Sequence, residues 1–294
     1  MWREAHTLAP AKINLHLRVG DRRPDGFHDI VSLFQMVDLY DALVVRLAGG
    51  DGEIHLTGDF DFPSSRNLVT RAVDVFRAET GLRAGLSIIV DQRIPIGGGF
   101  GGGSSDAVAT LRCLRALLLP DLPLDRMDVM AASLGSDVPF FLGTAAALVE
   151  GRGERITPLR SRTDFAVAAV VPDVQIGSSE AYAALDAVAA RGTAGGSDPV
   201  DAPGLAAAYA ALPPSEWRFA NSFDAVGMAV PAVAEARDAL LSAGAGTARL
   251  TGSGSAVIAV FDDPAAARAC VDRVNASGHW GLLLCPLATI PRLW

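Results

Sequence analysis

Residues 94–107 read IPIGGGFGGGSSDA, and this glycine run constrains the fold more than any other stretch of the chain. Six of these residues are glycines, interrupted only by Phe100. An apolar run typical of a strand precedes the loop at residues 86–90, and a helix-patterned run follows it at residues 106–119. Glycines permit positive φ angles and close backbone approach, so several N–H groups can converge on one ligand. A strand, a glycine loop and a helix N-terminus in this order predict a phosphate site.

Two serines end the glycine run. Ser104 or Ser105 could cap the following helix, donate to a phosphate, or reach a phosphate-bound Mg²⁺. A flexible linker is the plain alternative, but linkers rarely lie between a strong strand and a strong helix. We therefore favour the phosphate loop.

The glycine spacing also has to be compared with other phosphate-binding loops. Gly97, Gly99 and Gly102 satisfy G-x-G-x-x-G. A dinucleotide fold would add a second strand ending in an acidic residue about 20 residues later, and no such strand is visible. A P-loop would close the run with Gly-Lys and then Ser or Thr, and that triplet is missing.

Composition limits what the predicted phosphate site can serve. The chain has 294 residues, of which 50% are hydrophobic and 20% charged, as in globular proteins with one large or two ordinary domains. The formal net charge of −8 disfavours nucleic acid and anionic membranes as partners. The three cysteines match no metal or disulfide spacing, and neither a signal-like segment nor a run of about 18 apolar residues is present. We expect a cytoplasmic protein that binds small molecules, and a homodimer is left open.

The N-terminal part of the chain predicts a strand over residues 7–19 with one polar face. Its alternation has a period of two, with two sets of side chains: apolar Ile13, Leu15, Leu17 and Val19, and polar Lys12, Asn14, His16 and Arg18. An Asp-Gly turn at residues 25–26 then places Phe27 and His28 at the start of the next strand. On its own, the polar face could equally be solvated.

Further elements follow in the first half. Strands are expected in an antiparallel sheet at residues 30–37, 42–47 and 54–57, with a turn at residues 40–41. A helix is predicted at residues 68–80, with three candidate cap residues: Ser64, Ser65 and Asn67.

The stretch GSDVPFF at residues 135–141 follows a predicted helix at residues 124–134. A residue before proline avoids the α conformation, so Asp137 is expected at a change from helix to extended chain. Asp137 could be a reactive carboxylate or could simply cap this turn.

The second half predicts a smaller α+β layer. Its expected strands are residues 165–171, 248–250, 256–261 and 282–287, and its expected helices are residues 178–190, 232–243 and 265–274. Residues 191–201 are rich in Gly, Ser, Asp and Pro and are predicted to be mobile. We expect two domains, residues 1–160 and 161–294.

Several of these stretches resemble, in order, the motifs of the GHMP small-molecule kinases. The glycine run is similar to P-x-G-x-G-L-G-S-S-A-A, with the extra glycine of the diphosphocytidyl-methylerythritol kinase branch. APAKINL, RPDGFH and GSDVPFF also resemble motifs of that branch, and TGSGS at residues 251–255 resembles the third GHMP motif. The chain departs from the pattern at four positions: Gln92, Phe100, Asp106 and Val108. Asp106 is expected to bring a negative charge close to the phosphates.

The resemblance implies a two-domain GHMP-kinase-like α+β fold, with mixed or antiparallel sheets packed with helices and the active site in the cleft between the domains. It implies ATP and Mg²⁺ as cofactors. The implied reaction phosphorylates the 2-hydroxyl of 4-diphosphocytidyl-2-C-methyl-D-erythritol in non-mevalonate isoprenoid precursor biosynthesis. Lys12 and Asp137 are implied as catalytic residues, with Asp137 accepting the hydroxyl proton and Lys12 keeping Asp137 ionised and stabilising the alkoxide.

Binding roles are also implied by the resemblance, residue by residue. The nucleotide is expected to contact Pro95, Gly97, Gly98, Gly99, Phe100, Gly101, Gly102, Gly103, Ser104, Ser105 and Asn67, with Ser105 as the metal ligand. The phosphate acceptor is expected to contact Asn14, Phe27, His28, Asp137, Ser178, Tyr182, Gly252 and Ser253. Among these, His28 would meet the cytosine edge, and Phe27 and Tyr182 its faces.

Two other classes of function remain as alternatives. Another GHMP kinase, of the homoserine or mevalonate type, is disfavoured by the G-F-H signature and by the pair of Lys12 and Asp137. A non-catalytic binding protein with the same fold is disfavoured because both of these residues are present.

Overall fold

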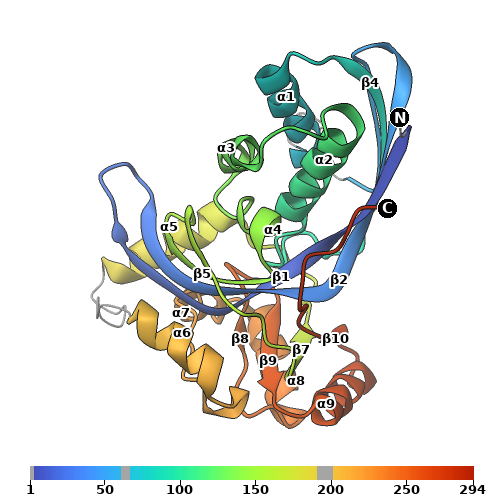
Figure 1. The fold of residues 1–294 in the computed structure, drawn as a ribbon. Helices are drawn as coiled ribbons and strands as arrows, with labels where there is room; N and C mark the ends of the chain where they lie inside the picture. Colours follow the sequence, from blue (N-terminus) through green and yellow to red (C-terminus); the bar gives the residue numbers. More distant parts are fainter. Residues whose placement is uncertain (1–2, 61–66, 191–200) are drawn as a thin grey trace.

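The computed structural model describes residues 3–60, 67–190 and 201–294, and two β-sheets carry its fold (Figure 1). The first sheet is built from the first half of the chain and the second sheet from the second half. The predicted α+β class is therefore confirmed. The candidate caps Ser64 and Ser65 lie outside the described residues, and so do residues 191–200 of the predicted mobile stretch 191–201. Asp201, the last residue of that stretch, is the N-cap of a helix, because its side chain accepts from the N–H of Gly204.

The first sheet has six strands in the spatial order β3-β4-β2-β5-β6, with β1 paired to β2. Its strands are β1 (Glu4–Arg22), β2 (His28–Asp51), β3 (Ile54–Thr57), β4 (Ala84–Asp91), β5 (Ala146–Gly151) and β6 (Arg155–Pro158). Neighbouring strands are antiparallel except β3 and β4, which are parallel. The sheet is therefore mixed.

Strand β2 runs unbroken past Tyr40 and Asp41, so the predicted turn at these residues is wrong. The pairing with β1 shifts after Pro10, and this shift places an irregularity inside the ladder where a turn was expected. The Asp41 side chain is buried and accepts hydrogen bonds from the N–H groups of Arg93 and Ile94. Both bonds go to Oδ1, while Oδ2 is buried without a hydrogen-bond partner in the described part of the chain.

The prediction that residues 54–57 belong to an antiparallel sheet is also wrong, because β3 pairs in parallel with β4. Strand β4 lies between β2 and β3 and pairs with both. Leu86, Ile88 and Val90 of β4 are buried, whereas the residues of β3 alternate between half-buried and exposed. The more apolar strand takes the central position, and the short strand takes the edge.

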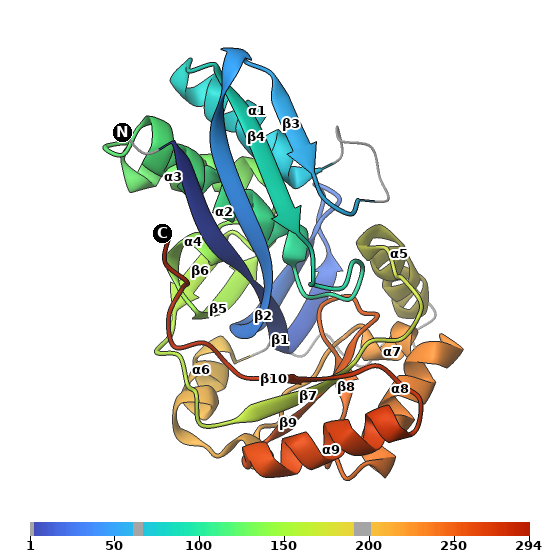
Figure 2. The same cartoon turned by 90° about the vertical axis from the view of Figure 1, so that its right-hand side faces the viewer.

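Helices cover one face of the first sheet. They are α1 (Leu68–Thr80), α2 (Gly102–Leu118), α3 (Leu124–Leu134) and α4 (Phe140–Gly143). In Figures 1 and 2, α1, α2 and α3 lie on the same side of the long strands. The helices predicted at residues 68–80 and 124–134 are confirmed. No helix within the described ranges is both long and apolar enough to span a bilayer.

The second sheet has four antiparallel strands in the order β10-β7-β9-β8. They are β7 (Ala166–Val170), β8 (Arg249–Leu250), β9 (Val257–Phe261) and β10 (Gly281–Leu284). The helical elements of this half are α5 (Ser178–Ala189), α6 (Ala202–Ala211), the 3₁₀ helix η2 (Pro214–Glu216), α7 (Asp224–Gly227), α8 (Pro231–Ser242) and α9 (Pro264–Ala276). The predicted strands and helices are present, and α6, η2 and α7 are additional to them.

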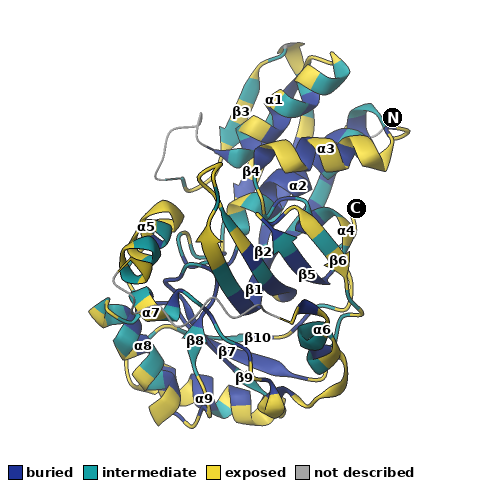
Figure 3. Ribbon diagram, turned by 90° about the vertical axis from the view of Figure 1, so that its left-hand side faces the viewer, coloured by how far each residue is buried: buried dark blue, intermediate teal, exposed yellow. Residues whose placement is uncertain are grey.

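Strands β1 and β2 belong to the first sheet and also pack against the second sheet. Ile13 and Leu15 of β1 belong to one hydrophobic cluster with Val167 and Ile258 of the second sheet. Figure 3 shows the buried middle of both strands where they pass between the two halves. The long hairpin of the first sheet therefore joins the two halves through a shared hydrophobic cluster.

The polar face of β1 is buried, not solvated. Lys12 and Asn14 are 3% and 2% exposed. The pairing shifts between Asn14 and His16, so Leu17 lines the same cavity as Lys12, while His16 contacts Phe219. The prediction that Leu17 continues the apolar face of the strand is wrong, because a one-residue slip moves later side chains to the opposite face.

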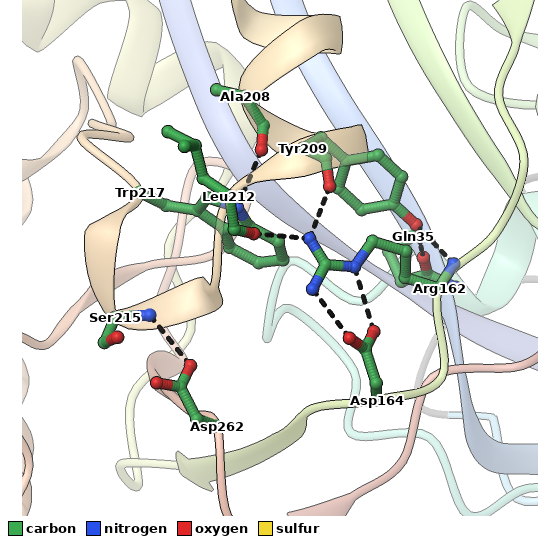
Figure 4. A network of polar contacts seen from close by, with 9 residues as sticks. All are labelled: Gln35, Arg162, Asp164, Ala208, Tyr209, Leu212, Ser215, Trp217 and Asp262. Atoms are coloured by element: carbon green, nitrogen blue, oxygen red, sulfur yellow. Dashed lines mark hydrogen bonds and ion pairs between the residues drawn. The ribbon is translucent and has the colours of Figure 1, made fainter.

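A hydrogen-bond network fixes the segment between the two sheets (Figure 4). The Tyr209 hydroxyl donates to Gln35 Oε1 at 2.7 Å and accepts from the N–H of Arg162 at 2.9 Å. The Arg162 guanidinium donates to the Tyr209 carbonyl at 2.6 Å and pairs with Asp164 at 2.7 Å. The domain boundary predicted between residues 160 and 161 falls in this segment and stays a prediction.

The last residues return to the first sheet. His6 and Trp294 exchange two backbone hydrogen bonds, at 2.9 and 3.1 Å, and the N–H of Leu287 donates to the carbonyl of Met36 at 2.9 Å. Figure 1 shows the C-terminus beside the N-terminal strand. The chain after β10 is thus part of the packing of the first half.

Candidate active site

A cavity of about 920 Å³ is lined by segments from both halves of the chain. Most residues predicted for the site lie on its wall: Lys12, Asn14, Phe27, His28, Pro95, Gly97, Gly99, Phe100, Gly101, Gly102, Gly103, Ser104, Asp137, Ser178, Tyr182, Gly252 and Ser253. Three predicted residues, Asn67, Gly98 and Ser105, do not line it.

An ion pair stands on the cavity wall. Lys12 Nζ lies 3.4 Å from Asp137 Oδ2, donates to Asn14 Oδ1 at 2.6 Å, and sits 4.8 Å from the centre of the Phe34 ring. The Lys12 side chain is 4% exposed and that of Asp137 is 33% exposed. The carboxylate therefore faces the cavity, with the ammonium held behind it by an amide oxygen and an aromatic face. Such a pair can accept a proton and stabilise a negatively charged oxygen.

Asn14 ties the ion pair to the second half of the chain. Its N–H donates to Thr251 Oγ1 at 2.9 Å, and its side-chain amide donates to Ser32 Oγ at 2.9 Å. The amide orientation is fixed by these partners, because Oδ1 already accepts from Lys12. The position of the ammonium thus depends on β1, on β2 and on the loop after β8.

Asp137 lies in a turn between α3 and α4, so the predicted change from helix to extended chain is wrong. Pro139 has helical angles, φ −59° and ψ −30°, and α4 begins directly after it. The N–H of Val138 donates to the Gly135 carbonyl at 3.3 Å. Proline suits the start of a helix because its fixed φ is helical and its missing N–H is not needed there. Two helices therefore hold Asp137 from both sides.

The glycine loop enters α2 as predicted, but the helix begins earlier, at Gly102. Gly101 is its N-cap residue with φ 73°, and no side chain caps the helix. The prediction of a serine cap is therefore wrong: Ser104 and Ser105 lie inside the first turn. The first N–H groups of a helix have no partner within it, so this end of α2 can bind an anion.

A second small-residue loop packs backbone to backbone against the glycine loop. The N–H of Ser255 donates to the Gly97 carbonyl at 3.0 Å. A Cβ atom at Gly99 would lie 2.1 Å from the carbonyl oxygen of Thr251, so no side chain fits there. The T-G-S-G-S stretch and the glycine run, far apart in the sequence, form one continuous part of the site.

Another part of the wall is built around His28. Its Nε2 lies 2.8 Å from Asp186 Oδ1, and its ring stacks on Tyr182 with centroids 5.1 Å apart and an angle of 23°. Tyr182 also contacts Phe223 edge to face, at 4.9 Å. Burial, with the charge of Asp137, raises the pKa of Tyr182 to about 12, so the phenol is neutral. The face of Tyr182 is thus packed against His28.

Phe27 lies at the open side of this region and is 51% exposed. The guanidinium of Arg152, from the turn between β5 and β6, is 4.9 Å from the centre of its ring. Arg152 and Asp186 line the cavity but were missing from the residues inferred from sequence. Asp186 had a usable signal, since it follows Tyr182 by four residues on a helix and so shares its face. For Arg152 the only sequence signal was its position between two glycines of a turn, Gly151 and Gly153.

The predicted site residues away from the wall have local roles. Asn67 caps α1, because its Oδ1 accepts from the N–H of Val69 at 2.9 Å. Ser105 is buried in the first turn of α2. Ser178, which does line the cavity, has its Oγ 3.2 Å from Ser253 Oγ and so links α5 to the second loop.

Burial opposes the negative charge that the sequence predicts for Asp106 close to the phosphates. Asp106 is buried and does not line the wall. Burial raises the pKa of Asp106 well above its usual range, and the charge of Asp41 raises it further. Burial also raises the pKa of Asp41, against the lowering effect of its two backbone hydrogen bonds. Burial therefore shifts Asp106 towards its neutral form.

The oxygen atoms on the cavity wall limit how a divalent cation could be coordinated. The described residues contain no cluster of three or more His, Cys, Asp or Glu. Asp137 and Ser104 offer single oxygens at the wall, whereas Ser105 Oγ is buried with no hydrogen-bond partner among the described residues. Mg²⁺ typically takes one or two protein oxygens and completes its shell with water and phosphate. The donors fit that arrangement and not an all-protein cage.

Comparisons with known proteins identify the family of this chain. Residues 67–144 match the GHMP kinases N terminal domain, and residues 211–279 match the GHMP kinases C terminal domain. The chain is 39% identical to the 4-diphosphocytidyl-2-C-methyl-D-erythritol kinase of Treponema pallidum (strain Nichols), covering 87% of this chain and 89% of that protein. It is 38% identical to the protein of the same name from Anaeromyxobacter sp. (strain K), covering 94% and 86%.

Solved structures show the same likeness. A crystal structure of 4-(cytidine 5'-diphospho)-2C-methyl-D-erythritol kinase matches with a TM-score of 0.79 and 32% identity, covering 96% of this chain and 98% of that one. A homoserine kinase from Cytophaga hutchinsonii matches in fold, with a TM-score of 0.69 and 19% identity, covering 100% of this chain and 98% of that one. With a glycine loop at a helix N-terminus, a lysine–aspartate pair beside it and this likeness along most of its length, the chain belongs to the GHMP kinase family of small-molecule kinases.

Proposed function

We propose that this kinase transfers the terminal phosphoryl group of ATP to the 2-hydroxyl of 4-diphosphocytidyl-2-C-methyl-D-erythritol. The products are the 2-phosphate and ADP, in non-mevalonate isoprenoid precursor biosynthesis. The observation that carries the proposal is the Lys12–Asp137 ion pair on the same cavity wall as the glycine loop and His28. The names of relatives that are 38–39% identical over most of the chain support this substrate.

The proposed roles in the chemical step follow from charge and exposure. Asp137 is the more exposed partner of the ion pair and accepts the proton of the attacking hydroxyl. Lys12 stabilises the developing alkoxide, since its ammonium is fixed beside the carboxylate. A new bond forms between the 2-oxygen and phosphorus, and the bond from phosphorus to the ADP oxygen breaks. Phosphoryl transfer of this kind depends mainly on positioning and on charge stabilisation.

The remaining wall residues bind and orient. The N–H groups at the start of α2 and in the glycine loop hold the phosphates of the nucleotide. Mg²⁺, when bound, neutralises phosphate charge, with Ser104 and Asp137 as the protein oxygens at the wall. Ser105 remains a candidate ligand on sequence grounds. The region around His28 and Tyr182 takes the cytosine of the acceptor.

A coupled ADP-release assay tests the proposed function. The purified protein is given ATP, Mg²⁺ and one alcohol at a time: the cytidine diphosphate-linked methylerythritol, homoserine or mevalonate. We expect turnover with the first alcohol only. Turnover with homoserine or mevalonate alone would assign another GHMP kinase activity. No turnover with any alcohol, together with measurable binding of the cytidine diphosphate-linked compound by calorimetry, would favour a binding protein.

A further inference from the structure

Asp186 makes a contact that the proposed chemistry does not use. Its Oδ1 lies 2.8 Å from His28 Nε2, and the His28 side chain is 8% exposed. The two residues come from different halves of the chain, His28 from the first residue of β2 and Asp186 from α5. Both line the cavity. A contact that joins the two halves at a cavity wall can determine which ligand groups the wall accepts.

The chemistry of the two partners fixes the position of a proton. An ionised carboxylate only accepts hydrogen bonds, so Nε2 of His28 must carry the hydrogen that it donates to Asp186. In the neutral ring the other nitrogen, Nδ1, is then an acceptor with a free lone pair. No hydrogen bond joins Nδ1 to another residue in the described part of the chain. Stacking on Tyr182 holds the plane of the ring in place.

Pyrimidine bases differ at the edge that such a nitrogen would meet. Cytosine presents an amino group, a donor, where uracil presents a carbonyl oxygen, an acceptor. An acceptor nitrogen pairs with the amino group, whereas against the carbonyl two lone pairs face each other. A site built to pair with one polar group rejects the analogue that lacks it, because buried groups are then left unpaired.

We propose that Asp186 is a specificity-determining residue: by accepting the Nε2 proton of His28 it leaves Nδ1 as an acceptor, which selects cytosine over uracil in the phosphate acceptor. This inference rests on the proposed function, because it assumes that the base lies against His28. Asp186 acts through His28 and is a positioning residue, without contact to the reacting atoms.

The test replaces the carboxylate by an amide of the same shape. Asp186→Asn can donate to Nε2 as well as accept from it, so the tautomer of His28 is no longer fixed. Calorimetry measures the affinity of each variant for cytidine 5'-diphosphate and uridine 5'-diphosphate. We expect the ratio of the two affinities to fall by about tenfold in Asp186→Asn, the scale of one hydrogen bond. In turnover, KM for the cytidine diphosphate-linked acceptor should rise while kcat changes little.

Glu180→Gln is the matched control, since it removes one negative charge from an exposed position of the same helix. It should leave the affinity ratio unchanged. Nitrogen-15 NMR of labelled histidine gives an independent readout: His28, assigned by its loss in His28→Asn, should be protonated at Nε2 in the unsubstituted protein and should change in Asp186→Asn. An unchanged affinity ratio in Asp186→Asn, or a His28 protonated only at Nδ1 in the unsubstituted protein, would overturn the inference.

The same experiments distinguish failure of the proposed function from failure of the role proposed for Asp186. If the unsubstituted protein binds cytidine 5'-diphosphate more tightly than uridine 5'-diphosphate but phosphorylates none of the alcohols, the proposed function fails and the role of Asp186 is still measurable. If turnover occurs and Asp186→Asn keeps the cytosine preference, only the role of Asp186 fails.

Discussion

The burial of each single residue determines its charge state and whether a ligand can reach it. Lys12 and Asp137 form one ion pair, yet the ammonium is almost fully buried and the carboxylate is one-third exposed. In the proposed mechanism the exposed partner meets the acceptor hydroxyl, and the buried partner is held behind it by Asn14. Asp106 is the opposite case, because burial raises its pKa and the residue does not line the cavity.

The ion pair gives the first prediction. Asp137→Asn keeps the shape of the side chain but removes the charge that accepts the proton, so kcat should fall by about 10²–10⁴-fold with both substrates still binding. Lys12→Met should give a comparable loss. If the two residues act as one unit, the double variant should be little worse than either single variant. Steady-state kinetics on the three variants decides this, and a fully active Asp137→Asn protein would end the proposed mechanism.

The buried carboxyl of Asp106 gives a prediction about pH. Its folded-state pKa is raised above the ordinary value of 3.8, so its stabilising contribution is fully present below that value. The contribution is lost as the pH rises towards the raised pKa, because the unfolded chain then ionises freely. Asp106→Asn removes the ionisable group. It should therefore increase the free energy of unfolding near pH 7 relative to the unsubstituted protein, with a smaller gain towards pH 4.

Urea denaturation at several pH values measures this effect. Asp128→Asn, at an exposed position of α3, is the control and should show no such pH-dependent gain. Asp41 faces the same region with a raised pKa of its own, so the comparison has to be made at Asp106 alone. A gain that grows as the pH falls would contradict the assigned direction.

At the scale of elements, the glycine loop contacts both halves of the chain. Its glycines are required for different physical reasons at different positions. At Gly99 a side chain would clash with the backbone of the other half, and at Gly101 it would meet Lys12 in a left-handed conformation. A Cβ at Gly103, in contrast, would have its nearest atom, Leu68 Cδ1, at 3.7 Å, which is ordinary contact. Gly103 is therefore the position that tests phosphate binding without disturbing the fold.

Gly103→Val should weaken nucleotide binding by about tenfold or more, because a branched side chain would stand before the free N–H groups of α2. The free energy of unfolding should change by less than about 1 kcal/mol, since valine replaces glycine in a helix. Calorimetry with ATP and urea denaturation measure the two effects.

Two glycine variants control this result. Gly143→Val, with nothing within 4 Å of its Cβ and no place on the wall, should bind ATP normally. Gly99→Ala should lower stability, because its Cβ would lie 2.1 Å from the Thr251 carbonyl oxygen. If Gly103→Val binds ATP with normal affinity, the assignment of the glycine run as a phosphate-binding loop is wrong.

The whole molecule depends on contacts between its two halves, because the cavity takes its wall from both. One such contact is the network of Gln35, Arg162 and Tyr209 (Figure 4). Tyr209→Phe would remove the donor to Gln35 and leave the N–H of Arg162 without its acceptor. Unfolding free energy should fall by about 1–3 kcal/mol, the effect of leaving a buried polar group unpaired.

The substrate KM values of Tyr209→Phe should stay nearly unchanged, since the residue does not line the cavity. Tyr40→Phe is the matched control. It removes a phenol hydroxyl that makes no hydrogen bond within the described ranges, so its stability should change little. Equal stability losses in the two variants would show that the Tyr209 network contributes nothing specific.

The sequence by itself determined most of the strands and helices and many of the residues that line the cavity. Period-two and helical patterns located the strands and helices, and the glycine run with its flanking strand and helix indicated a phosphate site, because these signals depend on neighbours in the chain. Most of the residues predicted for the site line one cavity. Lys12 and Asp137, 125 positions apart in the printed sequence, form the expected close pair.

Only the tertiary structure decided what depends on partners distant in sequence. The insertion of β4 between β2 and β3 follows from which strand has more apolar surface to bury. The pairing shift between Asn14 and His16 reverses the faces of β1, and strand periodicity cannot reveal such a shift. The raised pKa of Asp106 and the pairing of His28 with Asp186 likewise depend on burial and on packing between distant segments, which no local pattern encodes.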